Sequence, residues 1–264
     1  MKILGIETAA ATASAALLDD EHLLGEFTLC NRMTHSQTLL PMMDQLRQLG
    51  GLELSDVDAI AVSAGPGSFT GLRIGSATAK GLGLAWDRPL IPVSTLAAMA
   101  YQLMAEHVLI CPMMDARRGT VFAGMYAFDP AFEQLAAPCA MEAGELVELA
   151  GKTALERGLE KVIFLGDGTL TAAPFYGRCA AAFIQAPPHL SRQRAGAVAA
   201  LGLHFMKTQN PVGIEGGSLQ TAAQHAPVYL KVSQAERERA ARGGRAAKPG
   251  IGDPFKKEKP HEEH

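Results

Sequence analysis

Short apolar runs and turn signals alternate over the first thirty residues of the chain. Lys2–Glu7 and Ala13–Leu18 are apolar runs separated by the small residues Thr8–Thr12, and His22–Leu29 follows the Asp19-Asp20 pair. Apolar runs of this length with turn-forming residues between them are typical of β-strands joined by tight turns. The sequence therefore predicts a three-stranded meander at this end of the chain.

A helical period follows this meander. Thr34 and Gln37 have the spacing of a capping box, and Gly50-Gly51 is a stop signal. Pro41 lies between them and removes one backbone hydrogen bond, so we expect the helix to bend there. The residues that share the apolar face, at i, i+3, i+4, i+7 and i+10, are Leu39, Met42, Met43, Leu46 and Leu49.

The same reasoning predicts strands and helices along the rest of the chain. In the first half they are a buried strand 57–63, a helix 69–86, a strand 90–93 and a helix 94–106. In the second half they are strands 108–115, 120–128 and 135–141, a helix 142–157, a strand 161–165, a helix 169–178, a strand 182–184 and a helix 191–207. The order β-β-β-α-β-α-β-α thus occurs twice.

This repeat of element order predicts an α/β fold with two lobes of the βββαβα type. We divide the chain into an N-terminal lobe 1–106, a C-terminal lobe 107–190, and a segment 191–232 whose helix and final strand, Pro227–Lys231, return to the body. Residues 233–264 are charged and poor in large apolar side chains, so we predict that they are disordered.

Composition narrows the class of protein. Of 264 residues, 48% are hydrophobic and 19% charged, as in an ordinary globular protein. The four cysteines are far apart without a CxxC pair, which argues against a zinc ribbon and fits a reducing cytoplasm. No run approaches the roughly 18 apolar residues of a membrane span, and no signal peptide is expected.

Charge is distributed unevenly between the body and the last residues. Residues 1–230 carry 15 Lys+Arg and 21 Asp+Glu, a net charge of −6, whereas residues 231–264 carry 9 and 6, a net charge of +3. An acidic body binds a phosphate backbone poorly. If RNA is involved, we expect a partner to hold it.

Three turns have the composition of phosphate-binding loops. A carboxylate followed by a small turn, at Glu7-Thr8, and glycine-rich loops that precede helices can both present backbone N–H groups to an anion. An ordinary tight turn is the favoured explanation at Glu7-Thr8, and a strand-to-helix turn explains the loop 65–71 without a ligand. Neither a Walker A nor a Rossmann motif is present. The candidate residues are Glu7, Thr8, Gly65, Gly67, Ser68, Gly166, Asp167 and Gly168.

The predicted helix 69–86 is unusually rich in small residues. Gly71, Gly75, Ala79 and Gly83 recur every four residues, and each glycine costs roughly 1 kcal/mol relative to alanine in a helix interior. Close packing against the parent sheet or against another subunit would offset this cost. The residues alone leave both explanations open.

No recognised catalytic motif is present. The sequence lacks HExxH and GxSxG, and no cysteine and histidine are spaced as a catalytic pair. His35 fits a capping or surface role, and the charged turn Asp115–Gly119 fits solvent exposure or anion binding.

Several strings resemble one family. ILGIET, HSQTLLPMMDQL, the highly specific GPGSFTGLRIG, PLIPVSTLAAMA, MDARRGTVFAGMY, FLGDG and APVYLK resemble the TsaB family over about residues 1–232. The resemblance implies the duplicated fold of actin, sugar kinases and heat-shock chaperones. It also implies a role in making threonylcarbamoyladenosine in tRNA, next to the anticodon.

The same resemblance implies that the chain is not an enzyme. TsaB is similar to its catalytic paralogue TsaD, which holds a metal with an HxxxH motif after a PV strand end. The matching positions here are Thr95 and Met99, and a hydroxyl and a thioether are poor substitutes for two imidazoles. We therefore expect no metal and no cofactor, with weak nucleotide binding at the interface or cleft left open. The alternatives are a small-molecule phosphotransferase and a metallopeptidase.

The resemblance further implies a partner surface on the first two helices of the N-terminal lobe. We expect TsaD, the ATPase TsaE and a second copy of the chain as partners, tRNA only through the complex, and a cytoplasmic location. The residues assigned to this interface are His35, Leu39, Met42, Met43, Leu46, Gly71, Gly75, Thr78, Ala79 and Leu82.

Overall fold

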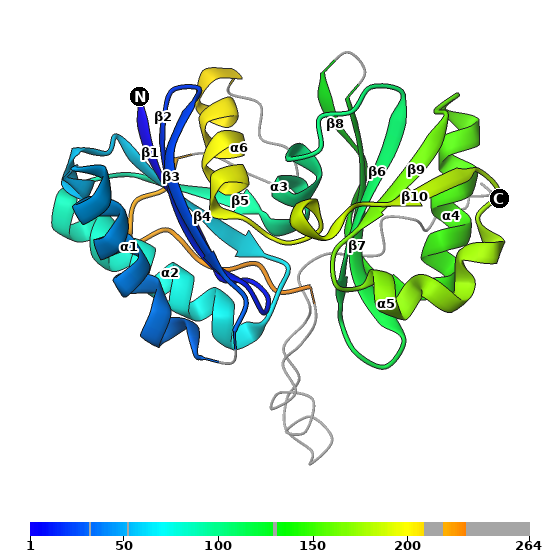
Figure 1. The fold of residues 1–264 in the computed structure, drawn as a ribbon, viewed down its shortest axis with the longest axis horizontal. Coiled ribbons are helices and arrows are strands. Elements are labelled where there is room, and N and C mark those ends of the chain that lie inside the picture. The colour runs from blue at the N-terminus through cyan, green and yellow to red at the C-terminus, as the bar shows by residue number, and fades with distance from the viewer. Residues whose placement is uncertain (32, 52, 129–130, 209–218, 231–264) are drawn as a thin grey trace, which may run out of the picture.

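The chain forms two five-stranded sheets with the same topology (Figure 1). The computed structural model describes residues 1–31, 33–51, 53–128, 131–208 and 219–230. The first sheet has the order β3-β2-β1-β4-β5, and the second has the order β8-β7-β6-β9-β10. In each sheet the first three strands are antiparallel and the last two run parallel to the first, so the predicted repeat of element order is confirmed.

The strand bounds follow the predicted apolar runs closely. In the first sheet they are β1 (Lys2–Glu7), β2 (Ala13–Asp19), β3 (His22–Leu29), β4 (Ala59–Gly65) and β5 (Leu90–Ser94). In the second they are β6 (Val108–Asp115), β7 (Thr120–Phe128), β8 (Phe132–Glu142), β9 (Lys161–Leu165) and β10 (Ala182–Gln185). This duplicated arrangement agrees with the two-lobed α/β fold that the sequence predicted and that the resemblance to TsaB implies.

Helices α1 (His35–Gly50) and α2 (Phe69–Trp86) lie side by side on the outer face of the first sheet (Figure 1). Leu4 and Ile6 of β1 point to this face and are fully buried. They pack with the apolar face of α1, because alternate residues of a strand and every third or fourth residue of a helix meet in one layer.

Helices α3 (Thr95–Tyr101) and α6 (Ala195–Thr208) fill the layer between the two sheets (Figure 1). Ile3 on β1, Met99 on α3, Tyr126 on β7 and Val198 on α6 belong to one buried apolar cluster. Helix α3 follows the last strand of the first sheet, and α6 follows the last strand of the second. The two lobes therefore share one core, and our residue bounds for the lobes stay a prediction.

The outer face of the second sheet is covered by α4 (Ala143–Glu156), α5 (Thr169–Ala172) and a 3-10 helix (Ala173–Arg178). Short 3-10 helices also span Leu54–Asp56 and Pro188–Leu190. The predicted helix 169–178 is thus divided into an α-helix and a 3-10 helix, at the point where Pro174 supplies no backbone N–H.

Some predicted helix ends are wrong. The helix predicted at 94–106 ends at Tyr101, because Met104 and His107 adopt positive φ angles and Glu106 forms a β-bridge with Phe128. The capping box is also wrong, since Thr34 precedes α1 but its hydroxyl bonds to side chains, including Gln37, and caps no backbone N–H. The predicted disordered segment 233–264 lies outside the described residues.

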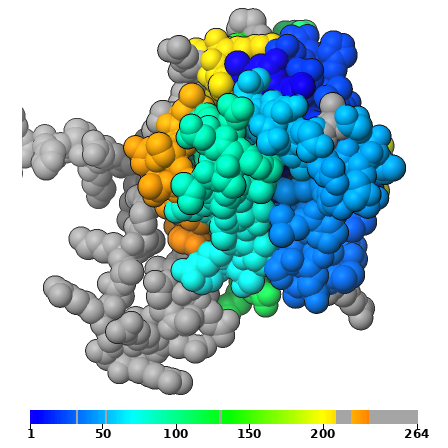
Figure 2. All heavy atoms as spheres, turned by 90° about the vertical axis from the view of Figure 1, so that its left-hand side faces the viewer, coloured from blue at the N-terminus to red at the C-terminus, as the bar shows by residue number. Residues whose placement is uncertain are grey.

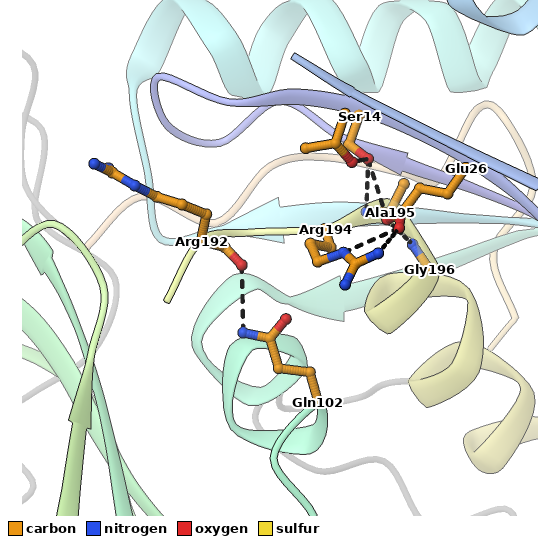
Figure 3. Close-up of polar contacts among 8 residues, drawn as sticks. Ser14, Glu26, Gln102, Arg192, Arg194, Ala195 and Gly196 are labelled. Carbon is orange, nitrogen blue, oxygen red and sulfur yellow. Dashed lines mark hydrogen bonds and ion pairs between the residues drawn. The ribbon is translucent and has the colours of Figure 1, made fainter. Parts of the chain in front are cut away.

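A buried carboxylate holds the start of α6 against the first sheet (Figure 3). Glu26 on β3 is 6% exposed and accepts hydrogen bonds from the Gly196 backbone N–H at 3.0 Å and from the Arg194 guanidinium. Ser14 on β2 accepts the Ala195 N–H at 3.0 Å. A carboxylate at a helix N-terminus is favoured by the helix dipole and satisfies N–H groups that lack helical partners.

We expect Glu26→Ala to lower the free energy of unfolding by about 1–3 kcal/mol, because it leaves the Gly196 N–H without its buried acceptor. Urea unfolding measures this loss. The matched control is Glu21→Ala, which breaks an exposed ion pair from the same helix, Lys207–Glu21, and should change stability by less than about 0.5 kcal/mol. Equal effects of the two substitutions would contradict the role of Glu26 at the start of α6.

Candidate functional site

The predicted phosphate-loop residues fall into two groups, one on each lobe. Glu7, Thr8, Gly65, Gly67 and Ser68 meet where β1 and β4 end, and the Ser68 N–H donates to Ala9 O at 2.6 Å. The second group, Gly166, Asp167 and Gly168, follows β9, where Asp167 Oδ1 accepts the Asp115 N–H at 3.0 Å and the Gly168 N–H donates to Met113 O at 3.1 Å.

The turn between β1 and β2 (residues 8–12) donates a backbone hydrogen bond to the carboxyl group of Glu7, the last residue of β1. Glu7 is fully buried, and its Oε1 accepts the Ala9 N–H at 2.5 Å. Burial raises the pKa of Glu7 to about 7, and hydrogen bonds from Ala9 and Ser63 partly oppose that rise. The Thr8 N–H points to Ser63 Oγ at 3.5 Å. These two amides are therefore occupied within the chain, and the assignment of Glu7 and Thr8 to a phosphate loop stays a prediction.

The loop before α2 is in close contact with two other backbone segments of the chain, one at Val228 and one at Ala9. A side chain at Gly65 would overlap Val228 O, and one at Gly67 would overlap Ala9 O. Gly65 also adopts a φ of 124°, which favours glycine. Ser68 precedes α2 and its hydroxyl accepts the Gly71 N–H at 3.4 Å. Close approach of two backbones therefore accounts for the two glycines.

The glycine-rich face of α2 packs on the turn between β1 and β2. A side chain at Gly71 would overlap Thr8 O, and one at Gly75 would overlap Thr8 Oγ1. Thr8 Oγ1 donates to Gly71 O at 2.8 Å. Packing within the chain, which the sequence left open, therefore accounts for these two glycines.

The residue assignment of the partner interface needs correction. Seven of the ten assigned residues are buried against the chain's own sheet, because the periodic apolar positions of α1 and α2 form its outer core. They are Leu39, Met42, Met43, Leu46, Gly71, Gly75 and Ala79. The other three, His35, Thr78 and Leu82, are half-buried.

A different set of residues forms the exposed side of these helices, which we call the α1–α2 outer face. Figure 2 shows α1 and α2 side by side, with residues 219–230 along the other flank of α2. On α2 this face is a row of exposed residues three or four apart, which sequence reasoning missed because none of them belongs to the apolar repeat. The face comprises Leu40, Asp44, Gln48 and Leu49 on α1 and Thr70, Arg73, Ala77, Gly81 and Leu84 on α2.

The segment 219–230 is tied to α2 and to the ends of two strands. Lys80 Nζ donates to His225 O at 3.0 Å, and the Val228 N–H donates to Ala64 O at 2.7 Å. Arg73 lies 3.8 Å above the Phe69 ring and donates to Tyr229 Oη at 3.2 Å. The described part of the predicted strand Pro227–Lys231 is not a strand, because the hydrogen bond from Val228 to Ala64 on β4 is not continued into a ladder.

The two positions at which the resemblance implies metal-binding histidines in TsaD lie in α3. Thr95 and Met99 are both buried, and a side chain at Gly166 would lie 2.9 Å from Met99 Cε. Across the described ranges, no three histidine, cysteine or acidic side chains are grouped closely enough to hold a metal ion. In the same ranges no helix has the length and apolar character to cross a membrane.

Comparison with known proteins identifies the family. The family model "TsaD: tRNA N6-adenosine threonylcarbamoyltransferase" matches residues 30–224. The chain belongs to the TsaD family. Within this family it is similar to the "tRNA threonylcarbamoyladenosine biosynthesis protein TsaB" of Escherichia coli, with 40% identity over 131 residues, and to that of Bacillus subtilis, with 36% identity over 128 residues. The resemblance to TsaB is therefore confirmed.

These alignments cover only part of each TsaD-family protein. They span 49% and 48% of this chain, and the chain covers 56% of the length of each of the two relatives. A solved structure, "YeaZ from Pseudomonas aeruginosa", is similar over 87% of this chain and 99% of that chain, with a TM-score of 0.67 and 25% identity. The two-lobed arrangement thus has a match in an experimental structure of a similar protein.

Two glycines of α2 allow a matched test of its packing. We expect Gly71→Ala to lower the free energy of unfolding by about 1–3 kcal/mol, because the new methyl group overlaps the Thr8 backbone. Gly81 has no neighbouring atom within 4 Å of an added Cβ, so Gly81→Ala should raise stability by about 1 kcal/mol. Urea unfolding of both variants checks the pair, and stabilisation by both would show that α2 does not press on the turn.

Glu7 should make stability depend on pH. Its pKa is about 7 in the folded chain and 4.5 in the reference state, so between these values the folded state holds more protons. The free energy of unfolding therefore decreases as pH rises through this window, by about 3 kcal/mol in total. We expect Glu7→Gln to be more stable than the parent at pH 8 and to lack this component.

The measurement is the difference between parent and Glu7→Gln in urea unfolding from pH 5 to 8. The exposed Glu145 on α4 provides a control, because Glu145→Gln should leave the parent's pH profile unchanged. A constant difference between parent and Glu7→Gln across the range would contradict the prediction.

Proposed function

We propose that this chain is the non-catalytic scaffold subunit of the machinery that synthesises threonylcarbamoyladenosine in tRNA. It pairs with TsaD, recruits TsaE and meets tRNA through the complex. The observation that carries the proposal is the presence of Thr95 and Met99, in a TsaD-family chain, at the two positions where the resemblance implies metal-binding histidines. A hydroxyl and a thioether do not reproduce a two-imidazole site.

The alternative of a phosphotransferase has less support. A kinase of this fold needs free amides and an accessible carboxylate beside the nucleotide phosphates. Here the Ala9 N–H is paired with Glu7, and the Glu7 carboxyl group is buried. A scaffold subunit would instead bind its partner through the exposed outside of the same lobe.

The α1–α2 outer face supports the scaffolding role. It joins large exposed apolar side chains, Leu40, Leu49 and Leu84, with the small residues Ala77 and Gly81. Small residues let the backbone of a partner helix approach closely, and apolar side chains gain free energy when a partner covers them. We propose that TsaD and a second copy of the chain compete for this face.

A reconstituted modification assay tests the function. With TsaD, TsaE, the threonylcarbamoyl-adenylate donor and tRNA, transfer to adenosine should depend on this chain, and the chain alone should transfer nothing. Transfer that is equally fast without the chain would contradict the scaffold role. Transfer by the chain alone would contradict its non-catalytic nature.

The proposed surface is tested by Ala77→Arg. Ala77 is exposed and arginine favours helix, so the variant should remain folded while its long charged side chain blocks close helix packing. We expect its affinity for TsaD to decrease by at least about tenfold, measured by co-elution and titration calorimetry. The control is Glu148→Arg on the exposed side of α4, which should bind as the parent does. Unchanged binding of Ala77→Arg would exclude this face.

A further inference from the structure

The turn between β1 and β2 contacts the first turn of both helices that form the α1–α2 outer face. It contacts α2 through two hydrogen bonds: the Ser68 N–H donates to Ala9 O at 2.6 Å, and Thr8 Oγ1 donates to Gly71 O at 2.8 Å. Because Gly67 and Gly71 have no side chain, the two backbones meet directly. A change in the position of this turn should therefore also change the position of the start of α2.

The same turn holds the start of α1. His35 is the first residue of α1, and its ring Nε2 lies 2.7 Å from Ala10 O. The partner is a carbonyl oxygen, so Nε2 carries the hydrogen and donates it. The residue before α1, Thr34, makes no side-chain cap to the helix backbone. His35 therefore joins the first turn of α1 to the turn at residues 8–12 by a hydrogen bond.

Glu7 determines the shape of the turn on which both contacts depend. Its Oε1 accepts the Ala9 N–H at 2.5 Å, two residues further along the chain, and so fixes the peptide group between Thr8 and Ala9. The oxygen of this peptide group, Thr8 O, faces Gly71, and the next carbonyl, Ala9 O, accepts the Ser68 N–H. In the strand register, Glu7 lies opposite Ser14 of β2. Its side chain is on the same face of β1 as position Gly5, where an added side chain would overlap Ala195 O of α6. This is the face that meets α6. The carboxyl group is fully buried there, where a hydrogen bond is worth more than in water.

From these contacts we propose that Glu7 is a positioning residue for partner binding: through the turn at residues 8–12 it sets the first turns of α1 and α2 in the relative placement that the partner recognises. This inference rests on the proposed function, because the partner is TsaD. Glu7 itself lies beneath the turn and has no exposed surface, so it acts through the helices and not by contact with the partner.

Two substitutions at Glu7 separate its hydrogen bond from its charge. Glu7→Gln retains an oxygen that accepts the Ala9 N–H, whereas Glu7→Leu removes the acceptor at similar volume. We expect Glu7→Leu to increase amide hydrogen exchange at the starts of both helices, residues 36–40 and 70–74, by about tenfold or more. Glu7→Gln should exchange as the parent does. His35→Ala should increase exchange at the start of α1 alone.

Affinity for TsaD is the second readout, measured at a temperature where every variant is fully folded. Glu7→Leu should bind about tenfold more weakly than the parent, and Glu7→Gln should bind within about threefold of it. Val198→Ala is the matched control, because it removes core volume under α6 without touching the turn. It should lower stability without weakening binding.

The outcomes distinguish the inference from the proposed function. If the parent does not bind TsaD, the proposed function is wrong, and the exchange data still decide whether Glu7 positions the two helices. If the parent binds and Glu7→Leu binds equally well, or if its exchange rises no more at the two helix starts than that of Val198→Ala, the inference is wrong. If Glu7→Leu does not fold, His35→Ala decides: unchanged exchange at the start of α1 overturns the inference.

Discussion

The first lobe depends on the close contact between the backbone of the turn at residues 8–12 and helix α2. This contact exists only because Gly67 and Gly71 have no side chains, and a single methyl group at either position would overlap a carbonyl oxygen of the turn. The helix lies low on the sheet as a result, and the turn is covered from outside. The fully buried Glu7 lies at the end of β1 on the opposite face of the sheet, and its hydrogen bond to the Ala9 N–H joins that face to the turn.

The inner layer of the molecule is governed by a different constraint. The first sheet presents the small residues Gly5, Ala59 and Ala61 to α6, so that this helix approaches the strands closely. The carboxylate of Glu26 and the hydroxyl of Ser14 receive its first N–H groups. Small residues thus allow close packing on both sides of one sheet, and a buried acid bonds a backbone N–H near each contact: Glu7 in the turn that meets α2, and Glu26 at the start of α6.

Periodicity in the sequence predicted the strands, the outer helices and the duplication, because these features are encoded by local alternation of apolar and polar residues. It did not distinguish a core face from a partner face. Met42 and Met43 follow the helical repeat because they pack against the sheet, whereas the exposed row that includes Ala77 and Gly81 shows no regular apolar repeat. The roles of Glu26 and of residues 219–230 depend on contacts between positions far apart in the chain, such as Arg194 with Glu26 and Val228 with Ala64, which no local pattern reveals.

The placement of α6 also has a consequence for the order in which the chain is made. The strands β1 and β4 leave the ribosome early, but the helix that covers their inner face spans Ala195–Thr208 and is synthesised after the whole second sheet. Until then the nascent first lobe exposes Ile3, Ala59 and Ala61, and hydrophobic surface of this kind attracts chaperones and other unfinished chains. Completion of the first lobe is therefore a late, long-range event, and a ribosome that stalls between the two lobes would release a sheet with one uncovered side.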